Sequence, residues 1–174
     1  SGVPEGVTLS EGTNLGNGVW EVTAEQLEKH ITPKTRMLMF STPCNPTGSV
    51  YSKAELRAIA DVVKKHEDLY IMSDEIYEHI NYGEPVFSFA AIESMYDRTI
   101  TVNGVAKAFA MTGWRIGYLG APEWIAKACT KMQGQITSGA NSIAQRAVIT
   151  ALNESPSRQF GTGKVVYFTN NPAY

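Results

Sequence analysis

The chain of 174 residues is 43% hydrophobic and 18% charged, which is typical of a globular protein with a substantial core and excludes a disordered chain. Its formal net charge is −2, and no basic stripe or polybasic segment marks a surface for nucleic acid or for a membrane. No apolar run is long enough to cross a bilayer, and no spacing of His, Cys or acids marks a metal site. Two distant cysteines, Cys44 and Cys129, favour reduced thiols and a cytoplasmic location.

The first part of the chain predicts one short helix and one strand. Residues 1–22 are rich in turn-forming types and predict extended chain and turns. Thr23 and Gln26 have the spacing of a capping box, so a helix is expected from there to about His30. The continuous apolar run at residues 37–40 predicts a strand buried on both faces of a parallel sheet.

A second helix and a second strand follow, in the order of a β-α-β unit. Ser52 and Glu55 form another capping box, and the helix is expected to reach about Lys65. The apolar run at residues 69–72 predicts the next parallel strand, so the helix is the crossover between the two strands. The apolar positions at helical spacing, expected in the core, are Leu56, Ile59, Ala60 and Val63.

Polar residues stand where these two strands end. The loop at residues 41–48 carries Asn45 before a proline, where a cis peptide bond is possible and would aim the Asn side chain; alone, the loop is also ordinary turn chemistry. After the second strand, Asp74 and Tyr77 stand three positions apart, close enough for both side chains to address one ligand. An acid at the end of a buried strand is costly unless it meets a cation. A helix N-cap is the alternative role for Asp74. Glu75 is expected beside the site or at the surface.

A lysine follows the third predicted strand. Residues 81–98 read as an irregular excursion, and the β-branched run at residues 99–102 predicts a buried strand. Lys107 then stands at or just beyond the strand's carboxyl end, which is where ligands bind in open α/β sheets. Apolar neighbours would disfavour its charged form and make it an amine nucleophile, although a plain surface lysine has the same pattern.

The last part of the chain predicts one strand and two helices. Residues 115–120 predict a strand, and Pro122 opens a helix to about Gln133. A further helix is expected over residues 142–152, with Ile143, Ala147, Val148 and Ala151 on its apolar face. Three residues near the lysine are expected to pack in the core: Phe109, Met111 and Trp114.

Three segments together resemble one known family: residues 44–48, residues 73–77 and residues 107–117. In order and spacing they are similar to the class I/II pyridoxal-phosphate aminotransferases of the aspartate aminotransferase fold, and to their bacterial aspartate or aromatic branch. The resemblance covers about residues 20–152. It implies an α/β fold with a mostly parallel sheet flanked by helices, as a partial cofactor-binding domain at residues 1–152. Residues 153–174 would be a linker or tail toward a small domain.

The resemblance implies a pyridoxal 5′-phosphate site with five residues. Lys107 would bind the cofactor aldehyde covalently and act as the catalytic base. Asp74 would pair with the pyridine nitrogen, while Asn45 and Tyr77 would donate hydrogen bonds to the phenolic oxygen of the ring. Arg115 would contact the phosphate. Some relatives have a phosphate-binding serine three residues before the lysine, where this chain has Gly104.

The implied function is transfer of an amino group between an amino acid, aspartate or an aromatic one, and a 2-oxo acid such as 2-oxoglutarate. The resemblance also implies a homodimer, in which the loop at residues 137–142 faces the partner's cofactor. The fragment alone is expected to be inactive, because relatives bind the substrate carboxylate with a downstream arginine outside it. Two alternatives stay open: a lyase of the same fold and a regulatory module without turnover.

Overall fold

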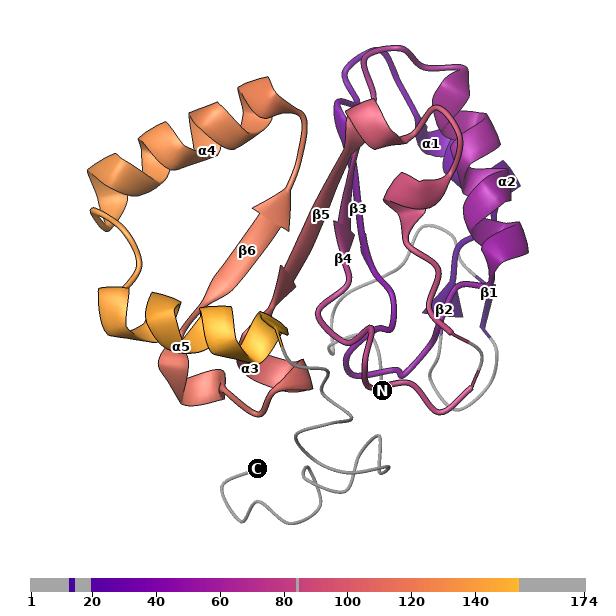
Figure 1. The fold of residues 1–174 in the computed structure, drawn as a ribbon. Helices are drawn as coiled ribbons and strands as arrows, with labels where there is room; N and C mark the ends of the chain where they lie inside the picture. Colours follow the sequence, from indigo (N-terminus) through magenta and orange to yellow (C-terminus); the bar gives the residue numbers. More distant parts are fainter. Residues whose placement is uncertain (1–12, 15–19, 84, 154–174) are drawn as a thin grey trace, which may run out of the picture.

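A four-stranded sheet with the strand order β3-β4-β5-β6 forms the centre of the molecule (Figure 1). The structure, a computed structural model, describes residues 13–14, 20–83 and 85–153. The three parallel strands are β3 (Met37–Ser41), β4 (Tyr70–Asp74) and β5 (Thr99–Gly104). The fourth, β6 (Gly117–Gly120), runs antiparallel to β5. The expected α/β fold with a mostly parallel sheet is therefore confirmed.

Capping boxes begin both early helices, as the sequence predicts. In α1 (Ala24–His30), the Gln26 backbone N–H donates to the Thr23 hydroxyl and the Gln26 side chain accepts from the Thr23 N–H at 2.9 Å. Ser52 and Glu55 make the same pair of bonds at the start of α2 (Lys53–Lys64). Because α2 connects the parallel strands β3 and β4, the β-α-β unit is also confirmed.

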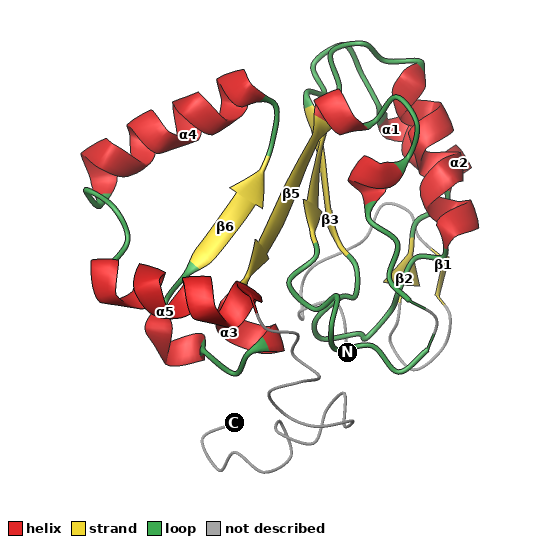
Figure 2. Cartoon of the chain, in the orientation of Figure 1, coloured by secondary structure: helices red, strands yellow, loops and turns green. Residues whose placement is uncertain are grey.

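The predicted strand at residues 115–120 and the two helices after it are present in the predicted order, whereas the short helices described below were not predicted (Figure 2). The excursion at residues 81–98 contains two 3-10 helices, η1 (Phe89–Ala91) and η2 (Tyr96–Arg98). The other helices are α3 (Val105–Ala108), η3 (Thr112–Trp114), α4 (Glu123–Ile136) and α5 (Ser142–Asn153). A separate antiparallel pair joins β1 (Thr13–Asn14) to β2 (Trp20–Glu21).

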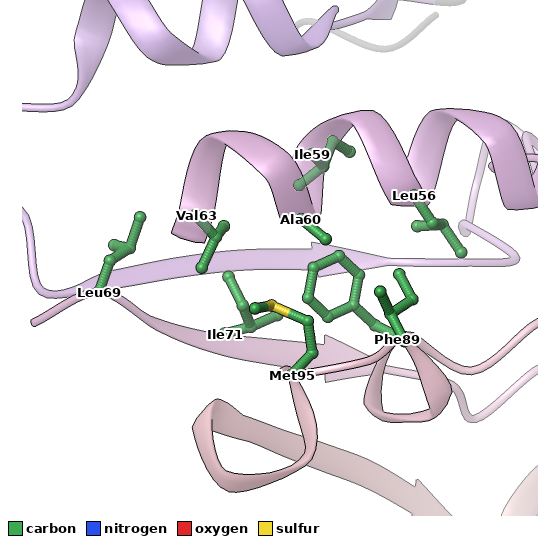
Figure 3. Close-up of a cluster of buried hydrophobic side chains, with 9 residues drawn as sticks. Leu56, Ile59, Ala60, Val63, Leu69, Ile71, Phe89 and Met95 are labelled. Carbon is green, nitrogen blue, oxygen red and sulfur yellow. The ribbon is translucent and has the colours of Figure 1, made fainter. Parts of the chain in front are cut away.

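The main core lies between α2 and one face of the sheet (Figure 3). Phe89 from η1 is fully buried there, and its ring packs edge to face on Phe40 with 5.6 Å between the ring centroids. This arrangement joins the irregular excursion to the strands. The buried residues of the cluster are Leu56, Ile59, Ala60, Val63, Leu69, Ile71, Phe89, Ile92 and Met95, which include all four predicted on α2.

The expectation that β3 is buried on both faces is wrong. Met37 and Met39 are 42% and 62% exposed, whereas Leu38 and Phe40, on the alternate face, pack against the core. The reason is that α2 covers only one face of β3, and within residues 20–83 and 85–153 nothing buries the other. A continuous apolar run does not tell these two cases apart.

A second, smaller core forms where α3 meets α5, and two packing predictions fail there. Val148 and Ala151 of α5 are buried against α3 as expected, but Ile143 is 72% exposed and Ala144 is buried in its place. Trp114 is 46% exposed rather than packed in the core. The other buried members of the cluster are Val105, Ala108 and Phe109, with Met111 packed against them.

No helix in the described part of the chain is long and apolar enough to cross a membrane. Asn153 is the last residue of α5, so most of the predicted linker at residues 153–174 lies outside the described residues.

Candidate active site

The three parallel strands end at one edge of the sheet, and the predicted site residues follow them. Ser41 pairs with Asp74 in the parallel register, and Asp74 pairs with Val102 of the next strand. The loop after β3 carries Asn45, the turn after β4 carries Tyr77, and α3 after β5 carries Lys107. Segments far apart in sequence thus meet at the edge where α/β proteins bind ligands.

Asn45 and Tyr77 are in direct contact. The Asn45 side-chain amide Nδ2 donates a hydrogen bond to the Tyr77 hydroxyl at 3.1 Å. The Asn45 loop is tied to β4, because the Thr42 N–H donates to the Asp74 carbonyl oxygen at 3.1 Å. The peptide bond between Asn45 and Pro46 is cis, one of the two states that the sequence allowed.

Asp74 is the last residue of β4, and its carboxylate folds back on its own backbone. Oδ1 accepts the Ile76 N–H at 3.1 Å, which is a local turn bond rather than a helix cap. The alternative role as a helix N-cap is therefore wrong, since a turn and not a helix follows Asp74. Among the described residues Asp74 forms no ion pair, so its charge is not neutralised within this part of the protein.

Lys107 lies over the ring of Tyr77. The half-buried lysine is in α3, and its Nζ is 5.7 Å from the centroid of the tyrosine ring. An ammonium over an aromatic face is held by the ring quadrupole. Lys107 has no carboxylate partner within residues 20–83 and 85–153. Contacts therefore connect Asn45, Tyr77 and Lys107 in one chain of neighbours.

Arg115 is not joined to these residues. It is exposed and adopts the left-handed backbone conformation, with φ 55° and ψ 47°. Its guanidinium Nη1 donates to the Thr112 carbonyl oxygen at 3.0 Å. Arg115 lines a cleft of about 1350 Å³ between β6, α4 and α5, whereas Asn45 and Tyr77 line another of about 950 Å³. The structure thus brings three predicted residues together, keeps Asp74 on the same edge and leaves Arg115 apart.

Gly104 is required by the close passage of the segment leading into β6. A Cβ at this position would lie 3.0 Å from the Ile116 carbonyl oxygen, 3.0 Å from Cδ1 of Ile76 and 3.2 Å from Cα of Gly117. Real Cβ atoms rarely come so close to backbone atoms. A serine at this position would require its neighbours to shift by a few tenths of an ångström.

Gly104→Ser is accordingly expected to lower the free energy of unfolding by about 1–3 kcal/mol, because overpacking forces the backbone to move. Urea denaturation of the chain measures the change. Gly113→Ser is the matched control, since a Cβ at Gly113 would meet no atom within 4 Å. The control should change stability by less than about 0.5 kcal/mol, and equal losses in both variants would contradict the packing argument.

Glu75, expected either beside the site or at the surface, is a buried residue. It is 3% exposed, so the surface alternative is wrong. Its Oε1 accepts from the hydroxyls of Ser73 and Ser88, both at 3.0 Å, and from the Phe89 N–H at 3.3 Å. The alternation of side chains along a strand could have predicted this burial. If the strand is extended by one residue, residue 75 shares a side of the sheet with residues 71 and 73. The donors from residues 88 and 89 had no sequence signal.

Burial raises the pKa of the Glu75 carboxyl, and the hydrogen bonds from Ser88, Ser73 and the Phe89 N–H partly oppose this rise. Since the folded pKa is above the unfolded value of 4.5, the stability that protonated Glu75 contributes is fully present below that pH. It is lost as the pH rises through the folded pKa. Glu75→Gln, which cannot ionise, should therefore become more stable relative to the wild type over this window, by at most about 1.4 kcal/mol per pH unit.

Urea denaturation at several pH values checks this trend. Glu93→Gln, which removes an exposed acid on the same excursion, is the control for the change in net charge. A difference between wild type and Glu75→Gln that stays constant with pH, or that runs in the opposite direction, would contradict the prediction.

Comparisons with known proteins agree on one family. The family model described as "Aminotransferase class I and II" matches residues 13–170. A probable aspartate/prephenate aminotransferase of Rhizobium leguminosarum bv. phaseoli is 46% identical over 159 residues, which cover 86% of this chain and 39% of that protein. A bifunctional aspartate aminotransferase and glutamate/aspartate-prephenate aminotransferase of Petunia hybrida is 53% identical over 127 residues, which cover 72% of this chain and 26% of that protein.

Solved structures give the same result. The aspartate aminotransferase of Rhizobium meliloti has a TM-score of 0.75 and 45% identity, with 78% of this chain and 34% of that chain covered. Across these relatives the chain spans between 26% and 39% of their length.

Proposed function

Because the chain belongs to the family of class I and II aminotransferases, we propose that the whole protein transfers an amino group between an amino acid and a 2-oxo acid. The proposed cofactor is pyridoxal 5′-phosphate. The observation that carries this proposal is the contact chain from Asn45 through Tyr77 to Lys107, beside Asp74 at the carboxyl edge of the sheet. The names of the relatives support aspartate or an aromatic amino acid as the amino donor. As the acceptor we propose a 2-oxo acid such as 2-oxoglutarate, which is what the family resemblance implies.

The residues at this edge fit the functional groups of the proposed cofactor. An aldehyde needs an amine, which Lys107 offers without a carboxylate partner in the described residues. A protonated ring nitrogen needs an anion, and Asp74 is likewise unpaired there. A phenolic oxygen needs hydrogen-bond donors, and the Asn45 amide and Tyr77 hydroxyl already lie together at 3.1 Å. The donor set therefore matches the group.

The phosphate is the part of the cofactor with the weakest match. Arg115 remains the proposed contact, because a guanidinium binds phosphate well. Gly104 contributes no hydroxyl, and a Cβ there would lie 3.0 Å from the Ile116 carbonyl oxygen. The phosphate must accordingly find other donors in the whole protein.

In the proposed mechanism each residue has one task. Pyridoxal phosphate, when bound, supplies an electron sink for the substrate carbanion. Lys107 Nζ would hold the cofactor by its aldehyde and would serve as the base for the proton at the substrate Cα. The Asp74 carboxylate keeps the proton on the ring nitrogen. Asn45 Nδ2 and the Tyr77 hydroxyl orient the ring through its phenolic oxygen and favour the anionic form of that oxygen.

Borohydride trapping tests the proposal. The whole protein is loaded with pyridoxal phosphate, its absorbance spectrum is recorded, and the protein is reduced and digested. We expect a visible absorbance band in the wild type and a stable cofactor adduct on the peptide that contains Lys107, with neither in Lys107→Ala. An adduct on another lysine, or binding that does not change in the variant, would contradict the assignment.

The 174-residue chain by itself is proposed to transfer amino groups little or not at all, because it spans at most 39% of the relatives above. Transamination by this chain that is lost in Lys107→Ala would refute that statement. We further propose a homodimer with the exposed loop at residues 137–142 toward the partner, and residues 1–152 as part of the cofactor domain with a linker after them. A cytoplasmic location is supported by the free thiols of Cys44 and Cys129.

A further inference from the structure

Glu75 lies between two residues of the candidate site, yet its side chain contacts the opposite side of the sheet. Side chains alternate along a strand, so Asp74 is on one side and Ser73 and Glu75 on the other. The contacts agree, because the Glu75 carboxylate binds Ser73 and the start of η1, which belongs to the main core. Glu75 thus connects the site edge to the core behind it through the Phe89 N–H.

Both the backbone and the side chain of Glu75 are held. The Glu75 N–H donates to the Val102 carbonyl oxygen of β5 at 2.9 Å, and its own carbonyl oxygen accepts the Glu78 N–H at 2.9 Å. Its Oε1 gathers three donors, of which the Ser88 hydroxyl and the Phe89 N–H come from 13 and 14 residues further along the chain. The turn that carries Tyr77 is therefore anchored to both β5 and the buried η1.

Burying a carboxylate at this position costs desolvation free energy, which the hydrogen bonds from the three donors must offset. Hydrogen bonds to a carboxylate are roughly twice as strong as those between neutral groups. An apolar residue here would leave the Phe89 N–H and two hydroxyls without their acceptor, in surroundings where Glu75 is 3% exposed. The anchor is consequently specific to a side chain with an acceptor oxygen at this reach.

We propose that Glu75 is a positioning residue of the cofactor site, acting through its neighbours Asp74 and Tyr77. The inference rests on the proposed function for what the site binds, but the anchoring itself does not. Glu75 sets the direction in which the Asp74 carboxylate leaves β4 and the position of the Tyr77 hydroxyl against Asn45. It touches neither the substrate nor the cofactor.

Hydrogen exchange and cofactor affinity test the role together in the whole protein. In the apoprotein of Glu75→Ala, we expect the amides of Ile76 and Glu78 to exchange at least about tenfold faster than in the wild type. The dissociation constant for pyridoxal phosphate should rise by at least about tenfold, the effect of losing roughly one buried hydrogen-bonding group. Glu75→Gln keeps the acceptor oxygen and should restore both values to within about threefold of the wild type.

Val63→Ala is the control for plain destabilisation. Val63 is fully buried in the same core and lies on α2, whereas the site residues follow β3, β4 and β5. It should lower the melting temperature while leaving cofactor affinity and the exchange of Ile76 and Glu78 within about twofold of the wild type. Ser88→Ala, which removes one donor at a distance from the site, should give an intermediate rise in both values and covers the case in which Glu75→Ala does not fold.

The outcomes separate this inference from the proposed function. If Glu75→Ala and Ser88→Ala match Val63→Ala in exchange and in affinity, Glu75 is only part of the core and the inference is wrong. If the wild type binds no pyridoxal phosphate, the proposed function fails. In that case faster exchange confined to residues 76–78 still supports the anchoring role, and exchange spread evenly over the core overturns it.

Discussion

Lys107→Ala is expected to lower kcat/KM of the whole protein for amino-group transfer by at least about a thousandfold. The substitution removes the amine that lies 5.7 Å from the centroid of the Tyr77 ring and that we propose to hold the cofactor and carry the substrate proton. Both tasks belong to one side chain, and its neighbours Tyr77 and Asn45 offer hydrogen-bond donors rather than an amine. Steady-state rates with aspartate and 2-oxoglutarate measure the effect.

Lys127→Ala provides the matched control for loss of a lysine. Lys127 is an exposed residue of α4, paired with Glu123 at 2.6 Å on the helix surface. Its replacement should change kcat/KM less than about twofold, since exposed pairs contribute little. If Lys107→Ala keeps more than about a tenth of the wild-type kcat/KM, the assignment of Lys107 as nucleophile and base is wrong. Product analysis on the same samples separates amino-group transfer from a lyase reaction.

Asp74→Asn is expected to lower kcat/KM by about 100-fold to 1000-fold. An amide of nearly the same shape keeps an oxygen for the Ile76 N–H, now bonded at 3.1 Å, so the local turn should survive. The amide has no charge with which to hold a proton on the ring nitrogen, and the electron sink is weakened. The loss should fall mainly on kcat, because the substrate itself does not contact Asp74 in the proposed mechanism.

Two further measurements show whether the effect of Asp74→Asn is chemical. The melting temperature should stay within a few degrees of the wild type, about 4 °C at most. Asp61→Asn serves as the control: Asp61 is exposed on α2, where its carboxylate pairs with Lys64 at 3.0 Å, and activity should not change. Wild-type activity in Asp74→Asn, or an equal loss in both variants, would rule out the proposed role.

Local signals in the sequence were enough for the early helices and for the order of elements. The capping boxes at Thr23 and Ser52 begin α1 and α2 where predicted, because the bonds that make a cap join residues three apart. The apolar positions of α2 were found for a similar reason, since helical spacing is a local property. The site residues that follow strands could also be proposed, because parallel strands in one sheet bring their carboxyl ends together.

Contacts between distant segments could not be predicted in this way. Met39 is exposed and Phe40 is covered, although both belong to one apolar run, since only the packing of α2 distinguishes the two faces of β3. On α5, Ile143 and Ala144 differ by about 100° around the helix, and the way α5 packs on the rest of the protein decides that Ala144 is buried and Ile143 exposed. Neither result depends on the residue's own type.

For the site, the sequence by itself was enough to propose which residues carry the chemistry, and it determined which strand each of them follows. The tertiary structure decided the rest: Asn45 meets Tyr77 across 32 positions, Arg115 stands apart, and a Cβ at Gly104 would be crowded by the Ile116 carbonyl. It also decided that Glu75 is buried, since the Ser88 and Phe89 donors arrive only when η1 packs into the core. Composition and spacing indicate the contacts of a residue within its own turn or strand. The burial of an acid and the crowding of a Cβ depend instead on which distant backbone segment lies beside the residue.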